Sequence, residues 1–456
     1  MAGSDTERSN DPSVKRLLLL LLCGYYSVAA RAGDDARSYR VLAVGSLKAE
    51  AVCSVTPSSS SGATVPLSHR HGPCSPAPSA KVPTLLELLR HDQLRAKYIQ
   101  RKLSGKNGTD GVQPLDLTVP TTLGSALDTW EYVITVAIGS PAVTQTMMID
   151  TGSDVSWVRC SSTDGLTLFD PSKSTTYAPF SCSSATCAQL GSQRNNCSNS
   201  GCQFTVRYLD DSNTTGTYGS DTLALSDSDT VEGFHFGCSL QEEGFDNEKF
   251  DGLMGLGGGA PSLVSQTAAT HGKSFSYCLP PTNRTSGFLT FGTPNGTSGF
   301  VTTPMLRWTR VPTFYGVLLR DISVGGRPLR IQPSVFSDGS VMDSGTIVTW
   351  LPRRAYSALS SAFRSGMRQY KRAPSQGILD TCYDFTGLDE VSVPTIELVF
   401  DGGAVVDLDY DGIMIQDCLA FTATSDNSII GNVQQRTFEV LHNVGQGVFG
   451  FRSGAC

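Results

Sequence analysis

The sequence contains two copies of one eleven-residue pattern, far apart along the chain. The first copy spans residues 148–158 and reads MIDTGSDVSWV, and the second spans 341–351 and reads VMDSGTIVTWL. Ten of the eleven columns hold identical or chemically similar residues, and each copy places a Trp seven residues after its Asp. An apolar-apolar-Gly run follows each copy, at 253–255 and 429–431. The chain is therefore predicted to contain two related halves, each contributing one carboxylate, Asp150 and Asp343.

Two carboxylates that share one site have a defined acid–base chemistry. At about 3 Å they repel by roughly 5 kcal/mol at an effective dielectric of about 20, so the pair holds one proton over a wide acidic range. One member then acts as base and the other as acid at the same pH. A water between them can lose a proton and attack an amide carbon while the second carboxyl group hydrogen-bonds the carbonyl oxygen. This chemistry needs neither a metal nor a nucleophilic side chain.

The residues beside each Asp suit this role. Gly152 and Gly345 allow the backbone to turn tightly next to the carboxylate. Neighbouring hydroxyls can orient the carboxylates by hydrogen bonds. These hydroxyls belong to Thr151, Ser153, Ser344 and Thr346.

From residue 130 onward the sequence pattern is typical of a β protein. Short β-branched or aromatic runs alternate with clusters of Gly, Pro, Ser or Asp. Helical candidates are few, at 262–271 and 355–370. The predicted strands include 131–138, 204–208, 288–291, 314–324, 396–400 and 438–442. A mostly β body with two or three helices follows.

At these residues the sequence resembles the pepsin-like aspartic endopeptidases, and among them the nepenthesin-like and nucellin-like plant enzymes. The resemblance covers about residues 123–456, and the segment LSHRHGPCS at 67–75 looks like prosegments of that group. It implies an all-β, bilobal pepsin-like acid protease fold, with two pseudo-symmetric lobes and a central peptide cleft. It also implies a secreted aspartic endopeptidase that hydrolyses peptide or protein substrates at acidic pH without a cofactor or metal.

The resemblance carries roles for single residues. Asp150 and Asp343 match the catalytic pair, and Tyr208 matches the flap tyrosine that closes over substrate. Ser153 and Thr346 match the hydroxyl residues that bond the outer carboxylate oxygens. Thr151 and Ser344 match the pair of hydroxyl residues that locks the two loops together. One departure concerns the flap, where relatives have glycines and this chain has Leu209 and Asp211. We expect a changed flap with altered specificity or lowered activity.

The first 30 residues have the layout of a secretory signal peptide. Lys15 and Arg16 precede the apolar run 17–22, and small residues follow at 29–32. A membrane anchor is disfavoured because the apolar stretch 17–30 is shorter than the about 20 residues of a span. Acidic residues before Lys15 count against a chloroplast transit peptide. Secretion to the extracellular space is expected, with the vacuole as the alternative.

Residues 31–122 form a basic leader before an acidic body. The leader carries 12 Lys and Arg against 7 Asp and Glu, whereas residues 123–456 carry 20 against 32. A capping box at Thr84 and Glu87 predicts a basic helix over 84–103. It is either an ordinary solvated helix or a propeptide helix that covers an acidic cleft, and the Asp motifs favour the second. The expected units are a signal peptide (1–30), a propeptide (31–122), an N-terminal lobe (123–300) and a C-terminal lobe (301–456).

The 13 cysteines suggest disulfides, because a secreted chain meets an oxidising environment. Ten lie after the leader, and spacing alone leaves their connectivity open. The resemblance implies the pairs Cys160–Cys238, Cys182–Cys202, Cys187–Cys197, Cys278–Cys456 and Cys382–Cys418. Candidate N-glycosylation sites, which agree with secretion, are Asn107, Asn196, Asn213, Asn283 and Asn295.

Other readings of the sequence are weaker. A net charge of −7 gives no reason to expect binding to nucleic acid or an anionic membrane. The glycine run at 255–260 lacks the βαβ surroundings of a dinucleotide site, and Asp154, Asp210 and Asp211 are expected to be surface carboxylates. A monomer is the default expectation. The main functional alternative is a catalytically weak or silent relative that binds proteins, like the plant inhibitors of microbial xylanases that share this fold.

Overall fold

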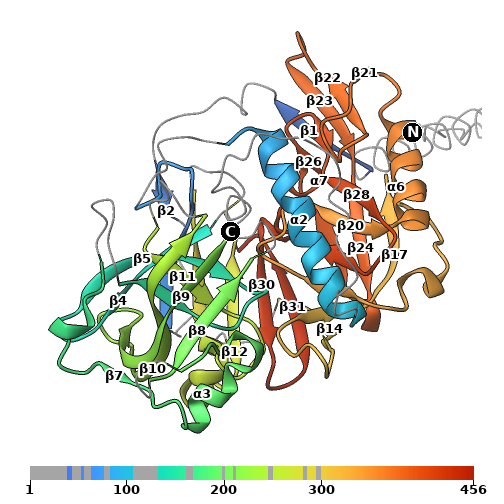
Figure 1. Ribbon diagram of the computed structural model, residues 1–456. Helices are drawn as coiled ribbons and strands as arrows, with labels where there is room; N and C mark the ends of the chain where they lie inside the picture. Colours follow the sequence, from blue (N-terminus) through green and yellow to red (C-terminus); the bar gives the residue numbers. More distant parts are fainter. Residues whose placement is uncertain are drawn as a thin grey trace, which may run out of the picture.

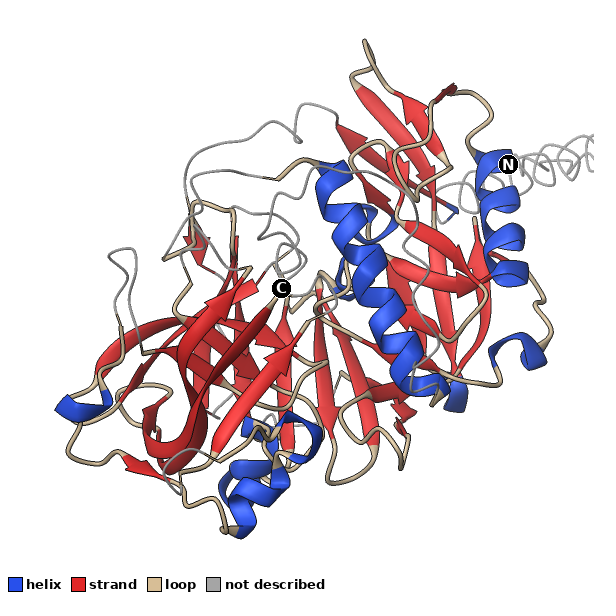
Figure 2. Cartoon of the chain, in the orientation of Figure 1, coloured by secondary structure: helices blue, strands red, loops and turns tan. Residues whose placement is uncertain are grey.

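A computed structural model describes residues 38–43, 53–55, 63–76, 83–105, 132–160, 168–197, 201–208, 212–244, 250–280, 285–293 and 299–455. It shows two β lobes side by side, with the helix α2 (Leu85–Ser104) lying between them (Figure 1). Strands dominate both lobes (Figure 2). The predicted mostly β, bilobal architecture is confirmed.

A 15-stranded sheet forms the N-terminal lobe and extends into the C-terminal half of the chain. Its strands from the C-terminal half are β14 (Val301–Pro304), β30 (Phe438–Asn443) and β31 (Val448–Ser453), and β30 pairs with β12 (Ser274–Cys278) of the first half. The remaining strands after the leader are β4 (Tyr132–Ile138), β5 (Val143–Asp150), β6 (Trp157–Arg159), β7 (Ala178–Pro179), β8 (Gln203–Arg207), β9 (Asn213–Ala224), β10 (Thr230–Glu243), β11 (Gly252–Gly255) and β13 (Thr285–Phe291).

Three smaller sheets build the C-terminal lobe. The six-stranded sheet contains β15 (Leu306–Arg307), β16 (Tyr315–Val317), β19 (Ser340–Met342), β20 (Thr349–Pro352), β28 (Phe421–Thr424) and β29 (Ser428–Ile430). The four-stranded sheets contain β17 (Leu319–Val324), β18 (Arg327–Pro328), β24 (Ile396–Phe400) and β25 (Val405–Leu408), and β21 (Lys371–Ala373), β22 (Cys382–Asp384), β26 (Met414–Ile415) and β27 (Cys418–Leu419). The expected helices are α4 (Leu263–Gln266) with α5 (Ala268–His271), and α6 (Arg353–Gly366); α3 (Ala185–Gln189) and α7 (Tyr410–Ile413) are short additions.

The sequence repeat corresponds to a repeated strand arrangement. In the first half, β11 runs parallel to β5 and antiparallel to β6. In the second half, β29 runs parallel to β19 and antiparallel to β20. Gly255 and Gly431 sit where the backbones cross closely, because a Cβ on either would come within 2.5 Å of a carbonyl oxygen. Each half therefore presents its Asp at the end of a buried strand.

The leader contributes β-strands to sheets of both lobes. Strand β1 (Tyr39–Ala43) pairs with β23 (Glu390–Pro394) of the C-terminal lobe, and β2 (Ser54–Val55) pairs with β13. Strand β3 (Ala63–His69) lies inside the large sheet between β13 and β4, and its Val65 and Leu67 side chains are fully buried. Part of the leader thus contributes to the core as well as covering the cleft.

The disulfides differ from the expected set at one place. The structure pairs Cys182 with Cys197 and Cys187 with Cys202, so the nested pairing Cys182–Cys202 and Cys187–Cys197 is wrong. Cys187 and Cys202 are buried in the core of the N-terminal lobe, whereas Cys182 and Cys197 lie nearer the surface. Packing of α3 against the sheet therefore fixes the partners.

The other bridges involve both the body and the leader. Cys160 is bonded to Cys238 and Cys382 to Cys418, as the resemblance implies, and Cys53 is bonded to Cys74 within the leader. Cys278 is disulfide-bonded, and its expected partner at position 456 lies outside the described residues. The predicted signal peptide, Asn107, Asn283, Asn295, Leu209, Asp210 and Asp211 also lie outside them.

Candidate active site

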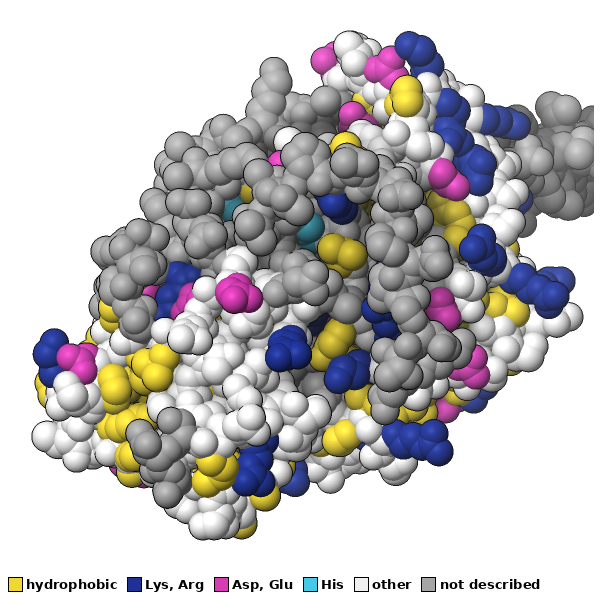
Figure 3. Space-filling view, viewed as in Figure 1, with side chains coloured by type: hydrophobic (Ala, Val, Ile, Leu, Met, Phe, Trp, Pro, Cys, Tyr) yellow, Lys and Arg dark blue, Asp and Glu magenta, His cyan; other side chains and the backbone are white. Residues whose placement is uncertain are grey.

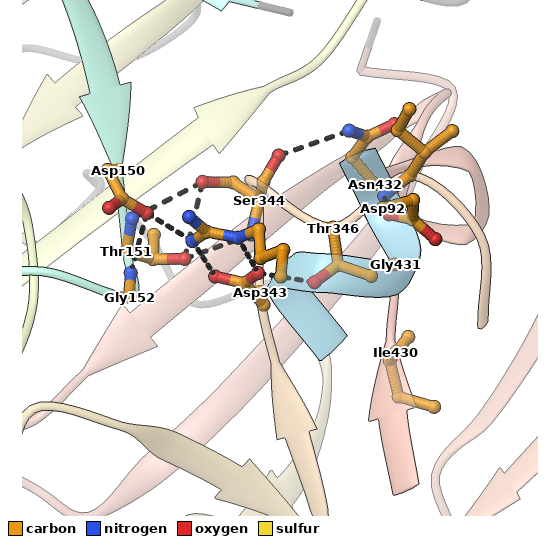
Figure 4. Close-up of polar contacts among 12 residues, drawn as sticks. Asp92, Asp150, Thr151, Gly152, Asp343, Ser344, Thr346, Ile430, Gly431 and Asn432 are labelled. Atoms are coloured by element: carbon orange, nitrogen blue, oxygen red, sulfur yellow. Dashed lines mark hydrogen bonds and ion pairs between the residues drawn. The ribbon is translucent and has the colours of Figure 1, made fainter. Parts of the chain in front are cut away.

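The two motif aspartates meet at the centre of the molecule. Asp150 ends β5 and Asp343 follows β19, and both are almost fully buried. Their side chains point toward one another (Figure 4). One guanidinium nitrogen, Nη2 of Arg95, bonds Oδ1 of Asp150 at 2.5 Å and Oδ1 of Asp343 at 2.7 Å. These two oxygens therefore lie no more than about 5 Å apart.

Hydroxyl groups join the two loops across the site. The amide of Ser344 donates to Oγ1 of Thr151 at 2.9 Å, and the Thr151 hydroxyl donates to the Ser344 hydroxyl at 3.2 Å. The amide of Thr151 also reaches the Ser344 hydroxyl at 3.4 Å. Asn432 steadies the second loop by donating from Nδ2 to the carbonyl of Ser344 (Figure 4). The reciprocal bonds hold one lobe's carboxylate in register with the other's.

The hydrogen bonds that hold the two carboxylates differ between the two loops. The Thr346 hydroxyl donates to Oδ2 of Asp343 at 2.6 Å, as the resemblance implies. On the other side, the amide of Gly152 donates to Oδ1 of Asp150 at 2.9 Å. The Ser153 hydroxyl is buried without a hydrogen-bond partner among the described residues, so it does not hold Asp150 here. In this state Asp150 Oδ1 is bonded by Arg95 and Gly152 instead.

Arg95 of α2 occupies the space between the two aspartates. Its Nε donates to Oδ2 of Asp343 at 2.6 Å, so it binds Asp343 with two parallel bonds while also bonding Asp150. A Cβ at Gly345 would collide with the guanidinium, and one at Gly152 would lie 2.6 Å from Nη2. The glycine of each motif thus makes room for a group on the dyad.

The charge of Arg95 changes the protonation of the site. Burial of Asp343 favours its neutral form, but the charge and hydrogen bonds of Arg95, with the Thr346 hydroxyl and Gly345 amide, hold its pKa below the ordinary value. Burial also opposes the charge on Arg95, but the two carboxylates outweigh this and raise its pKa. With α2 in place, Asp343 is therefore stabilised in its charged form.

A second buried contact anchors α2. Asp92, one turn before Arg95, accepts hydrogen bonds from the Ile347 amide at 2.5 Å and from Nε1 of Trp350 at 3.0 Å. Burial raises the pKa of Asp92 to about 7, although these bonds lower it in part. The helix also has the predicted capping box, with Glu87 accepting from the Thr84 amide.

The apolar face of α2 packs against the C-terminal lobe. Leu85 and Leu89 join a cluster around Ile347 and the Cys382–Cys418 bridge. Ala96 and Ile99 join a second cluster with Trp350 and other residues of the lobe. The ion pair therefore rests on a broad hydrophobic contact.

The predicted flap tyrosine lies close to the dyad. Nε1 of Trp157 donates to the hydroxyl of Tyr208 at 3.0 Å, and burial raises the pKa of that hydroxyl. Tyr98 of α2 is partly buried near Asp150, and its desolvation raises its pKa to about 12. A leader side chain thus fills space beside the flap residue.

Asp154 is not the surface carboxylate that the sequence suggested. It accepts from the Gly259 amide at 2.8 Å and from the Thr313 hydroxyl at 2.6 Å, so it ties the first motif to the C-terminal half. Burial raises its pKa. Within the described residues, no group of three or more His, Cys, Asp and Glu side chains is placed to hold a metal.

Arg95 and Asp92 were not singled out from the sequence. The 3.6-residue periodicity placed Arg95 on a basic face with four other cations, but it could not tell which of them reaches the dyad. A usable signal was present, since Asp92 and Arg95 stand three residues apart on one helix face and Asp92 is the only acid after the capping box.

The fold and the paired Asp-hydroxyl-Gly loops define a protein of the aspartic protease type, and sequence comparisons agree. The family model described as xylanase inhibitor N-terminal matches residues 132–293, and the C-terminal one matches 314–453. An aspartyl protease family protein of Arabidopsis thaliana is 37% identical over 96% of this chain and 98% of its own. Nepenthesin-1, an aspartic proteinase of Nepenthes gracilis, is 32% identical over 72% of this chain and 78% of its own. The chain belongs to the pepsin-like aspartic protease family.

Solved structures with this fold are more distant in sequence. The crystal structure described as edgp aligns with a TM-score of 0.59 at 21% identity, covering 73% of this chain and 93% of that one. Basic 7S globulin from soybean aligns with a TM-score of 0.57 at 18% identity, covering 70% and 90%. These similarities show the shared fold. Among the described helices, none combines the length and apolarity required to cross a membrane.

Proposed function

We propose that the protein is a secreted aspartic endopeptidase, made as a zymogen, that hydrolyses peptide bonds at acidic pH. The observation that carries this proposal is the meeting of Asp150 and Asp343 on two matched loops, with their oxygens within about 5 Å. The relatives named aspartic proteases support it. The several disulfides agree with the secretory route.

The reaction requires that Arg95 leave the dyad. Without that cation, two nearby carboxylates repel by roughly 4 kcal/mol at 4 Å and an effective dielectric of about 20, so one of them takes up a proton. The ionised carboxylate accepts a proton from a water as its oxygen bonds to the peptide carbonyl carbon. The protonated carboxyl group hydrogen-bonds the carbonyl oxygen and then gives its proton to it. The first carboxyl group then passes the proton it took from the water to the amide nitrogen, the second carboxylate takes back a proton from the gem-diol, and the C–N bond breaks.

Other residues would position these groups. Thr151 and Ser344 keep the two loops in register, and Thr346 fixes the outer oxygen of Asp343. Tyr208, held by Trp157, lies where a flap residue would cover a bound peptide. Gly152 and Gly345 leave room for the substrate backbone where the Arg95 guanidinium now lies.

The leader would act as an intramolecular inhibitor. Arg95 occupies the dyad, and α2 covers it with a hydrophobic face packed on the C-terminal lobe. The proposed units remain a signal peptide (1–30), a propeptide (31–122) and two lobes (123–300 and 301–456). Asn196 is exposed and suits glycosylation, whereas the Asn213 amide donates to Glu243.

The test uses the whole secreted chain, incubated at pH 3–5 with denatured globin. We expect cleavage that pepstatin blocks and that Asp150→Asn and Asp343→Asn each abolish. Asp227→Asn, at an exposed aspartate far along the chain from both motifs, serves as the charge-matched control and should keep full activity. Cleavage that survives both dyad variants would refute the proposed mechanism.

A second candidate is a binding protein without activity. The matching family models are named for xylanase inhibitors, and this name is the observation that favours it. The complete pair of motifs and the aligned aspartates favour the enzyme. Tight binding of a fungal xylanase by a chain that cleaves no protein at any pH from 3 to 7 would decide for the alternative.

A further inference from the structure

A cavity of about 1000 Å³ opens beside the dyad, between α2 and the N-terminal lobe. Asp150 and Gly152 lie on its wall, so it is continuous with the site of the proposed reaction. Its other walls come from β8 with Tyr208, from residues 189–195, and from the loop 310–314. A peptide extending from the dyad would therefore pass through this space once α2 withdraws.

The cavity is lined by cations of the body as well as of the leader. Arg207, at the end of β8, and Arg310, between β15 and β16, lie on its wall and are exposed. Arg194 also lines it and is held by a hydrogen bond to the Cys182 carbonyl. Figure 3 shows Lys and Arg side chains gathered between α2 and the N-terminal lobe.

The two exposed arginines lack a carboxylate partner in the part of the chain that the structure describes. Among the described residues, no Asp or Glu lies within ion-pair distance of Arg207 or Arg310. In contrast, Arg159 pairs with Glu242 and Arg320 with Asp401. The carboxylates that follow Arg207 most closely in the chain, at 210 and 211, lie outside the described residues.

The acidic groups on the same wall already accept hydrogen bonds from other residues of the protein. Asp150 is bonded by Arg95 and Gly152, and Asp154 by Gly259 and Thr313. They are the only carboxylates on the described lining of the cavity. Residues 123–456 as a whole carry 12 more Asp and Glu than Lys and Arg, so this wall is a local cationic region in an acidic body.

The leader places a partly negative group against this region. A side chain built on Gly105, the C-cap of α2, would lie 3.9 Å from Nη1 of Arg310. The carbonyl groups at the C-terminus of a helix carry about half a negative charge. When α2 withdraws, Arg310 loses that neighbour and faces the open cleft.

We propose that Arg207 and Arg310, one from each half of the chain, select peptides with a Glu or Asp side chain in the part of the cleft beyond the dyad. A guanidinium recognises a carboxylate by two parallel charge-assisted hydrogen bonds. This inference rests on the proposed peptidase function for its cleavage arm alone, because peptide binding to the opened cleft can be measured without any cleavage.

The first experiment measures binding to the whole chain carrying Arg95→Gln and Asp150→Asn, held at pH 4.5 beforehand so that α2 withdraws and the cleft opens. Fluorescein-labelled octapeptides that differ only by Glu or Gln at one position are compared by anisotropy at pH 5.5. We expect at least fivefold tighter binding of one or more Glu peptides, and loss of that preference in Arg207→Gln/Arg310→Gln. The control Arg353→Gln/Arg354→Gln changes the charge equally on exposed α6 residues and should keep the preference. At pH 3.5 the preference should shrink, because the ordinary pKa of Glu is about 4.3.

The second experiment compares kcat/KM for the same peptides with acid-incubated wild-type chain. A Glu preference of at least fivefold that Arg207→Gln/Arg310→Gln removes supports the proposal. Equal binding of Glu and Gln peptides, or a preference that persists in Arg207→Gln/Arg310→Gln, overturns it whether or not the protein is active. A binding preference without any cleavage would refute the peptidase function and leave the acidic-peptide site supported.

Discussion

Arg95 and Asp343 are joined by two parallel hydrogen bonds, from Nε to Oδ2 at 2.6 Å and from Nη2 to Oδ1 at 2.7 Å. The same Nη2 also bonds Asp150, so one side chain of the leader neutralises part of the charge of both aspartates. A substrate carbonyl and an attacking water would need this same space. The leader helix and a bound peptide are therefore mutually exclusive at the dyad.

Removing the charge of Arg95 is expected to relieve latency. In Arg95→Gln the buried carboxylates lose their cation, which favours withdrawal of α2. Progress curves of peptide cleavage at pH 4.5 should show a lag for the wild-type chain that is shortened at least tenfold in the variant. Arg90→Gln, at an exposed position of the same helix, should keep the wild-type lag. An unchanged lag in Arg95→Gln would show that the ion pair does not maintain latency.

Two carboxylates with opposite effects on the docking of α2 set the pH dependence of its release. Docking lowers the pKa of Asp343, so this contact stabilises docking above the ordinary value of 3.8 and is lost as the pH falls through the lowered pKa. Docking raises the pKa of Asp92 to about 7, so this group favours docking at low pH and weakens it as the pH rises from 3.8 to about 7. Asp92 thus partly opposes the acid trigger.

Replacing Asp92 by Asn should remove this opposition. The amide oxygen can still accept a bond from the Ile347 amide or Trp350, but it does not titrate. Docking between pH 4 and 7 becomes stronger, whereas docking below about pH 3.8, where Asp92 is protonated in both the docked and the released helix, should change little. Release is measured over a pH series by intrinsic Trp fluorescence just after each pH jump, because Trp350 loses its contact with Asp92 when α2 withdraws. Asp92→Ala, which also removes the hydrogen bonds, should instead release at higher pH.

The dyad was predictable from the sequence because each motif fixes its own local geometry. The repeated Asp-hydroxyl-Gly pattern places each carboxylate at the end of a buried strand, and the apolar-apolar-Gly runs supply the parallel neighbours β11 and β29. Both halves then have the same strand arrangement, so the two aspartates meet by symmetry. The bilobal fold follows from the same repeat.

The features that the sequence did not predict depend on contacts between distant segments of the chain. The chain-entropy cost of closing a disulfide loop changes slowly with length, so spacing could not separate the nested pairing from Cys182–Cys197 and Cys187–Cys202. Burial of Asp154 depends on Thr313, which is 159 residues away. The choice of Arg95 among the helix cations depends on how α2 seats on the C-terminal lobe. The disulfide pairing and the burial of Asp154 leave no local sequence pattern, and the only local signal for Arg95 is Asp92 three residues before it.

The hydrogen bonds between Thr151 and Ser344 should matter for both stability and rate. Thr151→Val keeps the shape of the side chain but leaves the Ser344 amide without its acceptor in a buried site. We expect a loss of about 1–3 kcal/mol in the free energy of unfolding and a lower kcat as the two carboxylates lose register. Urea unfolding and peptide kinetics measure the two effects. Thr151→Ser, which retains the hydroxyl, should recover most of both.

His442 is expected to limit stability in acid. It is fully buried among Phe275, Tyr277, Tyr315 and Phe449, and burial lowers its pKa to about 3. The unfolded chain takes up a proton at about 6.5 while the folded chain does not, so stability is lost as the pH falls from 6.5 toward 3.

His442→Phe should remove this acid sensitivity. At pH 4 the gain relative to pH 7.5 is on the order of 3 kcal/mol in the free energy of unfolding. Denaturant unfolding in the Asp150→Asn background avoids self-digestion. Phe449→Leu alters the same cluster without a titrating group, so its effect should be equal at both pH values. An equal effect of His442→Phe at both pH values would mean that the folded chain also protonates this histidine.

The internal strand β3 makes a prediction about the leader as a whole. Leu67 is fully buried in the main core and sits between β13 and β4, although it belongs to the segment proposed to be a propeptide. Leu67→Ala should lower the free energy of unfolding of the whole chain by about 2–5 kcal/mol, the range for buried Leu→Ala changes. Leu86→Ala, at a leader residue that is 60% exposed, should change it by less than about 0.5 kcal/mol. Equal small effects would mean that the body folds without β3, and that release of the leader needs no replacement for this strand. A large effect at Leu67 alone would mean that another segment must fill the gap between β13 and β4 before the body can remain folded without its leader.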